Sequence, residues 1–136
     1  MNDRLRLQIP ADARYANWAR QSIYQLALLY GFSRQDAQDL KIVTGEALSN
    51  IILHAYEKRS GQFIFIEAMM QGHFIELRFQ DFGKQNPVSK LHIRDLSDYR
   101  ESGLGVYLIS ELSDYHYYDQ SAAVGTILTV KKRLRS

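Results

Sequence analysis

The sequence contains no cysteine at any of its 136 positions. A disulfide scaffold, a thiolate zinc site and a cysteine nucleophile are therefore excluded. Long apolar runs are also absent: the longest unbroken one, Leu26–Tyr30, is far shorter than the about 20 residues that a transmembrane helix needs. No apolar block follows the first charged residues, so a secretory leader is not expected. These absences favour a cytoplasmic protein that does not enter a membrane.

A chain-wide excess of basic residues is missing as well. The formal net charge is +2, but the last six residues contain four cations, so the rest of the chain carries −2. The four cations are Lys131, Lys132, Arg133 and Arg135. Direct nucleic-acid binding is not expected, because it requires a basic surface. We expect this basic tail to be the solvated end of a last strand, with a weak electrostatic contact to a partner as the alternative.

The residues that are present suit one folded domain over residues 1–136. Apolar residues make up 46% and charged residues 24%, which excludes a disordered chain or a fibre. A chain of this length buries about two-thirds of its unfolded surface, which is enough for a hydrophobic core.

Hydrophobic periodicity predicts a strand, two helices, two strands, a third helix and two final strands. The expected ranges are 4–9, 11–30, 33–57, 62–70, 73–80, 103–113, 115–118 and 126–134. Apolar residues recur at helical spacing in the first helix, among them Tyr15, Trp18, Ile23 and Leu29. Because strands pair locally and helices come in blocks, we expect an α+β fold, a two-layer α/β sandwich. Residues 81–102 show no clear period, and so long a loop is usually functional.

Three polar residues of the second helix, Glu46, Asn50 and His54, are spaced four apart. This spacing places them on one face of the helix. Such a stripe is usually solvated, but its neighbours here are apolar and small. The stripe is therefore a candidate wall of a partly buried cleft.

Three short glycine-containing segments follow at regular distances. Asp81 and Gly83 end a predicted strand, where glycine permits close approach of another backbone or a ligand. Gly103 and Gly105 open a predicted helix, where free backbone N–H groups can bind a phosphate. Gly125-Thr126 precedes the last strand. The sequence around Gly103 and Gly105 fits neither a dinucleotide fingerprint nor a Walker A loop. Each segment alone is a weak signal, and the order of the segments along the chain is the stronger one.

The blocks TGEALSNIILHAY, DFG, ESGLGVYLISELSD and GTILTVKK resemble the N box, G1 box, G2 box and closing Gly-Thr of the GHKL (Bergerat-fold) ATPases. Within that superfamily, the short chain resembles the bacterial anti-sigma factor serine/threonine kinases, and the resemblance extends from Leu5 to Lys132. It implies a histidine-kinase-like ATPase fold with a mixed, mostly antiparallel sheet, helices on one face and an ATP lid at about 82–105. One departure is Gln85, which stands where the Asp-x-Gly-x-Gly pattern has its second glycine.

The resemblance also implies ATP and Mg²⁺ as ligands. Asn50 would be the protein ligand to Mg²⁺. Glu46 would be the catalytic residue that orients or deprotonates the attacking hydroxyl. Asp81 would accept a hydrogen bond from the adenine amino group. Further implied contacts are Gly83 and Thr126 near the base, and Gly103 and Gly105 around the phosphates. Arg94 and Arg100 in the loop could reach the phosphates, with a solvated role as the equal alternative for each. A structural role is favoured for His54.

By the same resemblance, the protein would phosphorylate a STAS-domain anti-sigma factor antagonist, sequester a sigma factor and form a homodimer. Its first helix and its sheet surface would be candidates for partner contact. A switch kinase acting on another STAS partner without sigma binding is one alternative. Others are a non-catalytic interaction module of the same fold and a histidine-kinase catalytic fragment, although the chain shows no dimerisation hairpin with a phosphoacceptor histidine.

Overall fold

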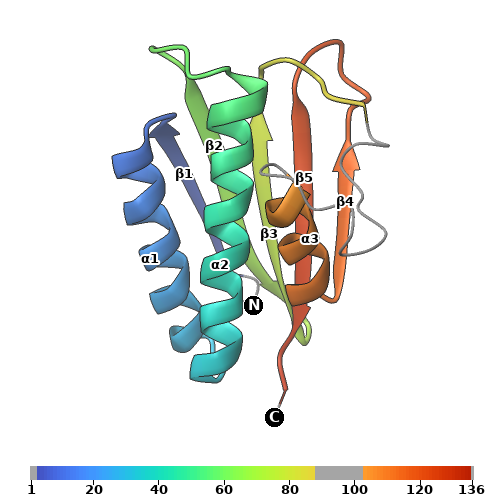
Figure 1. The fold of residues 1–136 in the computed structure, drawn as a ribbon. Helices are drawn as coiled ribbons and strands as arrows, with labels where there is room; N and C mark the ends of the chain where they lie inside the picture. The colour runs from blue at the N-terminus through green and yellow to red at the C-terminus, as the bar shows by residue number, and fades with distance from the viewer. Residues whose placement is uncertain (1–2, 88–102, 136) are drawn as a thin grey trace.

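The computed structural model describes residues 3–87 and 103–135. The elements follow the predicted order, with one addition after the second helix (Figure 1). They are β1 (Arg4–Pro10), α1 (Ala13–Leu29), α2 (Arg34–Asn50), the π-helix η1 (Ile51–Ala55), β2 (Phe63–Gln71), β3 (Phe74–Asp81), α3 (Gly103–Leu112), β4 (Tyr115–Asp119) and β5 (Thr126–Arg133).

The five strands form one sheet in the order β1-β2-β3-β5-β4. Each neighbouring pair is antiparallel, so the sheet expected to be mixed is antiparallel throughout the described residues. The three α-helices lie on one face of this sheet, which confirms the predicted two-layer α+β sandwich (Figure 1). β3 and β5 lie side by side at the centre, and their register places Asp81 opposite Thr126. The two motif residues therefore meet at the same end of the sheet.

Side-chain caps set the starts of the first two helices. The Asp12 carboxylate accepts from the backbone N–H of Arg14, and the Ser33 hydroxyl accepts from that of Asp36. These acceptors satisfy N–H groups that have no partner within the helix. The Ser33–Asp36 pair confirms the predicted start of the second helix.

The core lies between the helices and the sheet. The predicted stripe of α2 is buried, as are the predicted inward residues of β3. These residues are Leu40, Val43, Ala47, Ile51, Ile75, Leu77 and Phe79.

The first helix buries a narrower face than its sequence predicted. Ala19, Ile23 and Ala27 are its buried residues, at a spacing of four. Trp18 is 53% exposed, and Leu29 is 78% exposed. α1 lies at the edge of the helical layer beside β1 (Figure 1), so only the stripe facing α2 and the sheet is covered.

The second helix differs from its predicted range of 33–57. Its α-helical hydrogen bonding ends at Asn50 and widens into η1, where the N–H of Tyr56 donates to the carbonyl of Ile51, five residues earlier. The chain then turns through Glu57 and Lys58, which both have a positive φ. A single π-turn of this kind occurs frequently at functional sites, and its position follows Asn50 directly.

The basic tail is not wholly solvated, which corrects the expectation for Lys132. Its side chain is buried, because alternation along β5 points it toward the helices like Val130. The Lys132 Nζ donates to the carbonyl of Leu112 at the end of α3, over 2.8 Å. It also lies 3.6 Å from the Asp39 carboxylate and 3.9 Å from that of Asp36. Lys132 thus joins β5 to the end of α3 and the start of α2.

Over residues 3–87 and 103–135, no helix has both the length and the apolar character required to cross a membrane.

Candidate functional site

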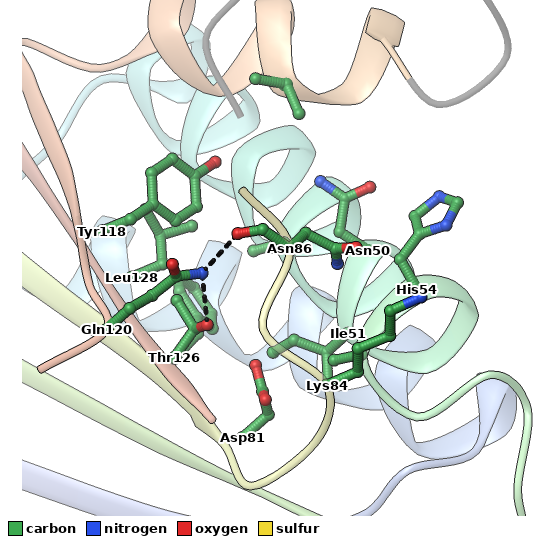
Figure 2. A pocket seen from close by; sticks show the side chains of 14 residues that line it. Asn50, Ile51, His54, Asp81, Lys84, Asn86, Tyr118, Gln120, Thr126 and Leu128 are labelled. Carbon is green, nitrogen blue, oxygen red and sulfur yellow. Dashed lines mark hydrogen bonds between the residues drawn. The ribbon is translucent and has the colours of Figure 1, made fainter. Parts of the chain in front are cut away.

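A pocket of about 160 Å³ opens between the end of α2, η1 and the β3–β5–β4 side of the sheet (Figure 2). Its apolar lining includes Ala47, Ile51, Ala55, Phe79, Val106 and Leu128. Its polar lining comprises Asn50, His54, Asp81, Lys84, Asn86, Tyr118, Gln120 and Thr126. A largely apolar cleft with a few convergent polar groups is the usual character of a small-molecule site.

Asp81 is the buried carboxylate of this pocket. It is the last residue of β3 and is 5% exposed. Burial raises the pKa of Asp81, while the backbone N–H groups of Gly83 and Thr126, which donate to its carboxylate, oppose that rise. The Gly83 bond measures 2.9 Å. These two donors fix the orientation of the carboxylate, which retains further lone pairs for a ligand.

Gly83 allows three chain segments to meet behind Asp81. A Cβ at this position would overlap the carbonyl of Ala55 in η1. The Gly83 carbonyl accepts from the N–H of Gly125, and the next N–H, of Lys84, donates to Ala55. Gly125 is equally confined, because its φ is +82° and a Cβ would overlap the Asp81 carbonyl. Both glycines therefore have a packing role, whatever they do toward a ligand.

The polar stripe of α2 reaches the pocket as its spacing indicated. Asn50 and His54 line it on the side opposite Gln120 and Thr126 (Figure 2). His54 is exposed there rather than packed into the core. Glu46 lies one turn before Asn50 and is half-buried next to α3.

Gly105 brings the first turn of α3 against these residues. A Cβ at Gly105 would lie 2.5 Å from Glu46 Oε2 and 3.6 Å from Asn50 Oδ1. The bare backbone thus leaves room for the Glu46 carboxylate. Gly103 is the first residue of α3, so both glycines belong to the helix rather than to a loop before it. Arg94 and Arg100, with most of the predicted lid, lie outside the described residues.

The sequence analysis did not identify four polar residues of the pocket: Lys84, Asn86, Tyr118 and Gln120. Lys84 and Asn86 belong to the segment that follows β3, and the other two belong to β4 and the turn after it. The pairing of Tyr118 with Leu128 could have been found from strand alternation. Gln120 carried no such signal, because its place depends on contacts with residues more than 30 positions away.

Residues 9–132 match the histidine kinase-like ATPase domain. The chain belongs to this family. It is 31% identical over 134 residues to the serine-protein kinase RsbW of Listeria monocytogenes, covering 91% of this chain and 85% of that protein. A Bacillus cereus protein of the same name is 32% identical over 120 residues.

Solved structures show the same histidine kinase-like ATPase fold. The RsbU and RsbW domains of Rv1364c from Mycobacterium tuberculosis match with a TM-score of 0.70 and 18% identity, over 97% of this chain and 32% of that one. The SiaB–SiaC complex from Pseudomonas aeruginosa matches with a TM-score of 0.67 and 12% identity, over 94% and 88%. The predicted resemblance is confirmed: family and relatives together support an ATP-binding protein kinase of the anti-sigma factor kinase family.

Proposed function

We propose that this protein transfers the γ-phosphoryl group of ATP to a serine or threonine of a STAS-domain partner. The observation that carries the proposal is the arrangement of Glu46 and Asn50 under Gly105, beside a pocket with a buried Asp81. Phosphoryl transfer needs positioning and charge neutralisation more than covalent chemistry by the protein. The site offers groups for both.

The apolar walls of the pocket suit a flat heterocycle such as adenine. Ile51, Phe79 and Leu128 supply apolar surface, and Asp81 supplies a fixed acceptor. The amino group of adenine is a donor that matches this acceptor, whereas guanine presents a carbonyl oxygen at the corresponding ring position. We infer that Asp81 selects adenine and that Thr126, opposite Asp81 in the sheet, adds a hydroxyl near the base.

Asn50 would hold Mg²⁺ through its amide oxygen. Mg²⁺ prefers hard oxygen ligands and is often bound by one or two protein groups together with substrate phosphates. Among the described residues, no group of three or more histidine, aspartate or glutamate side chains could hold a metal. A single amide ligand beside a polyphosphate agrees with this composition of the site. The bound ion would neutralise charge that develops on the transferred group.

Glu46 would orient the attacking hydroxyl and accept its proton. Its place one helical turn before Asn50 puts its carboxylate beside the proposed metal ligand. The backbone of Gly105 borders Glu46 Oε2, and the N–H groups in the first turn of α3 would face the phosphates. Gly103 and Arg100 belong to the same proposal as contacts to the phosphates.

We infer that the partners are a STAS-domain antagonist and a sigma factor, and that the protein forms a homodimer. Structural similarity to SiaB, solved together with SiaC, supports a protein partner. The homodimer proposal is supported by β1, an edge strand of the sheet whose neighbours Tyr15 and Trp18 are 43% and 53% exposed. Within residues 3–87 and 103–135, β1 pairs only with β2, and such an edge next to exposed aromatic side chains favours association.

Calorimetric titration with ATP, in the presence and absence of Mg²⁺, tests the nucleotide proposal. We expect binding that needs Mg²⁺, and a loss of at least about tenfold in affinity in Asn50→Ala, the equivalent of about 1.4 kcal/mol. Asn17→Ala, an exposed change on α1, is the matched control and is expected to bind normally. Absence of binding by the unaltered protein would leave only the interaction-module alternative.

Transfer of labelled phosphate to a recombinant STAS-domain protein tests the catalytic assignment. Glu46→Ala is expected to bind Mg-ATP but to lose about 100-fold or more in turnover, the usual contribution of a general base. Unchanged phosphorylation by this variant would remove Glu46 from the mechanism. A pull-down with sigma factor distinguishes the anti-sigma kinase from a switch kinase that lacks sigma binding.

A further inference from the structure

Gln85 stands where the related G1 box pattern has its second glycine, and the structure indicates what replaces that glycine. Glu57 and Lys58 are the described non-glycine residues with a positive φ, so the backbone at Gln85 needs no glycine. Its half-buried side chain crosses to the turn between β4 and β5. The departure from the pattern therefore creates contacts that a glycine could not make.

The side-chain amide nitrogen of Gln85 is surrounded by three backbone carbonyls of that turn. Its Nε2 donates to Ala122 over 2.8 Å, to Gly125 over 2.9 Å and to Gln120 over 3.3 Å. An amide NH₂ group has two hydrogens, so the longest contact shares one of them. Three acceptors around one atom also fix which end of the amide points at the turn.

A second glutamine makes the reverse connection. Gln120, in the turn itself, donates from Nε2 to the carbonyl of Asn86 over 2.8 Å and to Thr126 Oγ1 over 3.1 Å (Figure 2). The two side chains thus fasten the segment after β3 to the β4–β5 turn from both sides. Asn86, Gln120 and Thr126 all line the proposed nucleotide pocket.

The same segment is also fixed on its other side. The N–H of Lys84 donates to Ala55 in η1 over 2.9 Å. One wall of the pocket is therefore held between η1 and the β4–β5 turn, close to Asp81.

We propose that Gln85 and Gln120 form a clasp that holds this wall in its binding conformation before nucleotide arrives. The inference rests on the proposed nucleotide-binding function. Gln85 and Gln120 are positioning residues, since they act through Asn86, Thr126 and the turn. Ordering the wall in advance removes an entropy cost that binding would otherwise carry. Restoring the glycine of the family pattern at position 85 should consequently weaken nucleotide binding.

The test compares the Kd of ADP and ATP for the unaltered protein, Gln85→Gly, Gln85→Glu and Gln120→Ala. We expect Kd to rise about five- to thirtyfold in Gln85→Gly and Gln120→Ala, the range that losing one or two net hydrogen bonds gives. Gln85→Glu should bind ADP and ATP most weakly of these variants, because it places a carboxylate against three carbonyl oxygens. Gln71→Glu, the same chemical change at the exposed last residue of β2, is the control and should leave both Kd values unchanged.

Two readouts separate the clasp from a general loss of structure. The fold-change should be equal for ADP and ATP, because the clasp lies beside Asp81 and Thr126 rather than beside Gly105. The KM for ATP should rise while kcat at saturating ATP stays within about twofold, as removal of uniform binding predicts. Thermal unfolding identifies a variant that fails to fold, and if Gln85→Gly does so, Gln120→Ala serves in its place.

The outcomes are distinct for the two proposals. If the unaltered protein binds nucleotide and the Kd is unchanged in Gln85→Gly and Gln120→Ala, the proposed clasp is overturned and the proposed function is not. A fall in kcat without a rise in KM would also overturn it. Absence of binding by the unaltered protein would overturn the proposed function, and the clasp with it.

Discussion

Because Gly105 contacts Glu46, adding one methyl group in Gly105→Ala should lower the rate of catalysis without lowering the stability of the fold. In Gly105→Ala, the new Cβ would lie 2.5 Å from Glu46 Oε2, whereas ordinary contact begins at 3.4 Å. The carboxylate must therefore retreat by about 0.9 Å. Misplacement of a reacting group by about 1 Å can cost on the order of 100-fold in rate. We expect kcat for phosphoryl transfer to fall by about that factor.

Stability should not fall in parallel. Alanine has a higher helix propensity than glycine, by about 0.8–1 kcal/mol in a helix interior, and Gly105 is the third residue of α3. The atom displaced is the far end of a flexible side chain, so the shift itself costs little in the free energy of unfolding. We expect Gly105→Ala to unfold at the same temperature as the unaltered protein or a few degrees higher.

Gly45→Ala provides the matched control. Gly45 lies beside Glu46 on α2, and its added Cβ would meet only the Arg20 side chain, with Cδ at 3.3 Å. Gly45→Ala also gains helix propensity, in the interior of α2, without reaching the site. Circular dichroism melts and transfer of labelled phosphate at saturating ATP measure both effects. If Gly105→Ala keeps its kcat within about threefold, or if Gly45→Ala loses as much, Glu46 is not at the reacting geometry proposed.

Two further predictions concern Asp81 and the free edge of the sheet. Burial raises the pKa of Asp81 above its ordinary value of 3.8, so its contribution to stability is complete below pH 3.8 and is lost as pH rises through the folded value. Asp81→Asn should therefore gain in urea-measured stability relative to the unaltered protein as pH rises through that range, and an unchanged pH dependence would contradict the raised pKa. Its ATP-over-GTP preference should fall about 10- to 100-fold, and an unchanged preference would remove Asp81 from the base site. Trp18→Ser should convert the proposed dimer to a monomer, as measured by the molecular mass in light scattering. Val124→Ser, an exposed apolar control, should remain a dimer. If Trp18→Ser also keeps the mass of a dimer, the interface lies elsewhere.

Local signals in the sequence predicted most of the fold. The hydroxyl of Ser33 and the alternation of Ile75, Leu77 and Phe79 fix a helix start and a strand face through contacts within a few residues. The spacing of Asn50 and His54 placed both at the pocket for the same reason. The family motifs then indicated Asp81 and the fold that brings it there.

The remainder depended on contacts that no local pattern records. Periodicity cannot show that α2 widens into a π-turn after Asn50, because the extra residue keeps the chain helical. The burial of Lys132 depends on carboxylates and a carbonyl from two other elements. Gln85 was noticed only as a missing glycine, because its partners are 35 to 40 residues away.

The buried hydrogen bond from Lys132 holds one end of α3, and Gly105 lies near the other end. Its C-terminal end is fastened through Leu112, and about 10 Å of helix separates that point from Gly105. A tilt of about 5° around the fastened end moves Gly105 by roughly 1 Å, which is as far as the added methyl group would push Glu46. If Glu46 acts as proposed, a tilt of α3 would change the space left for its carboxylate, and the hydrogen bond from Lys132 at the opposite end of the helix opposes such a tilt.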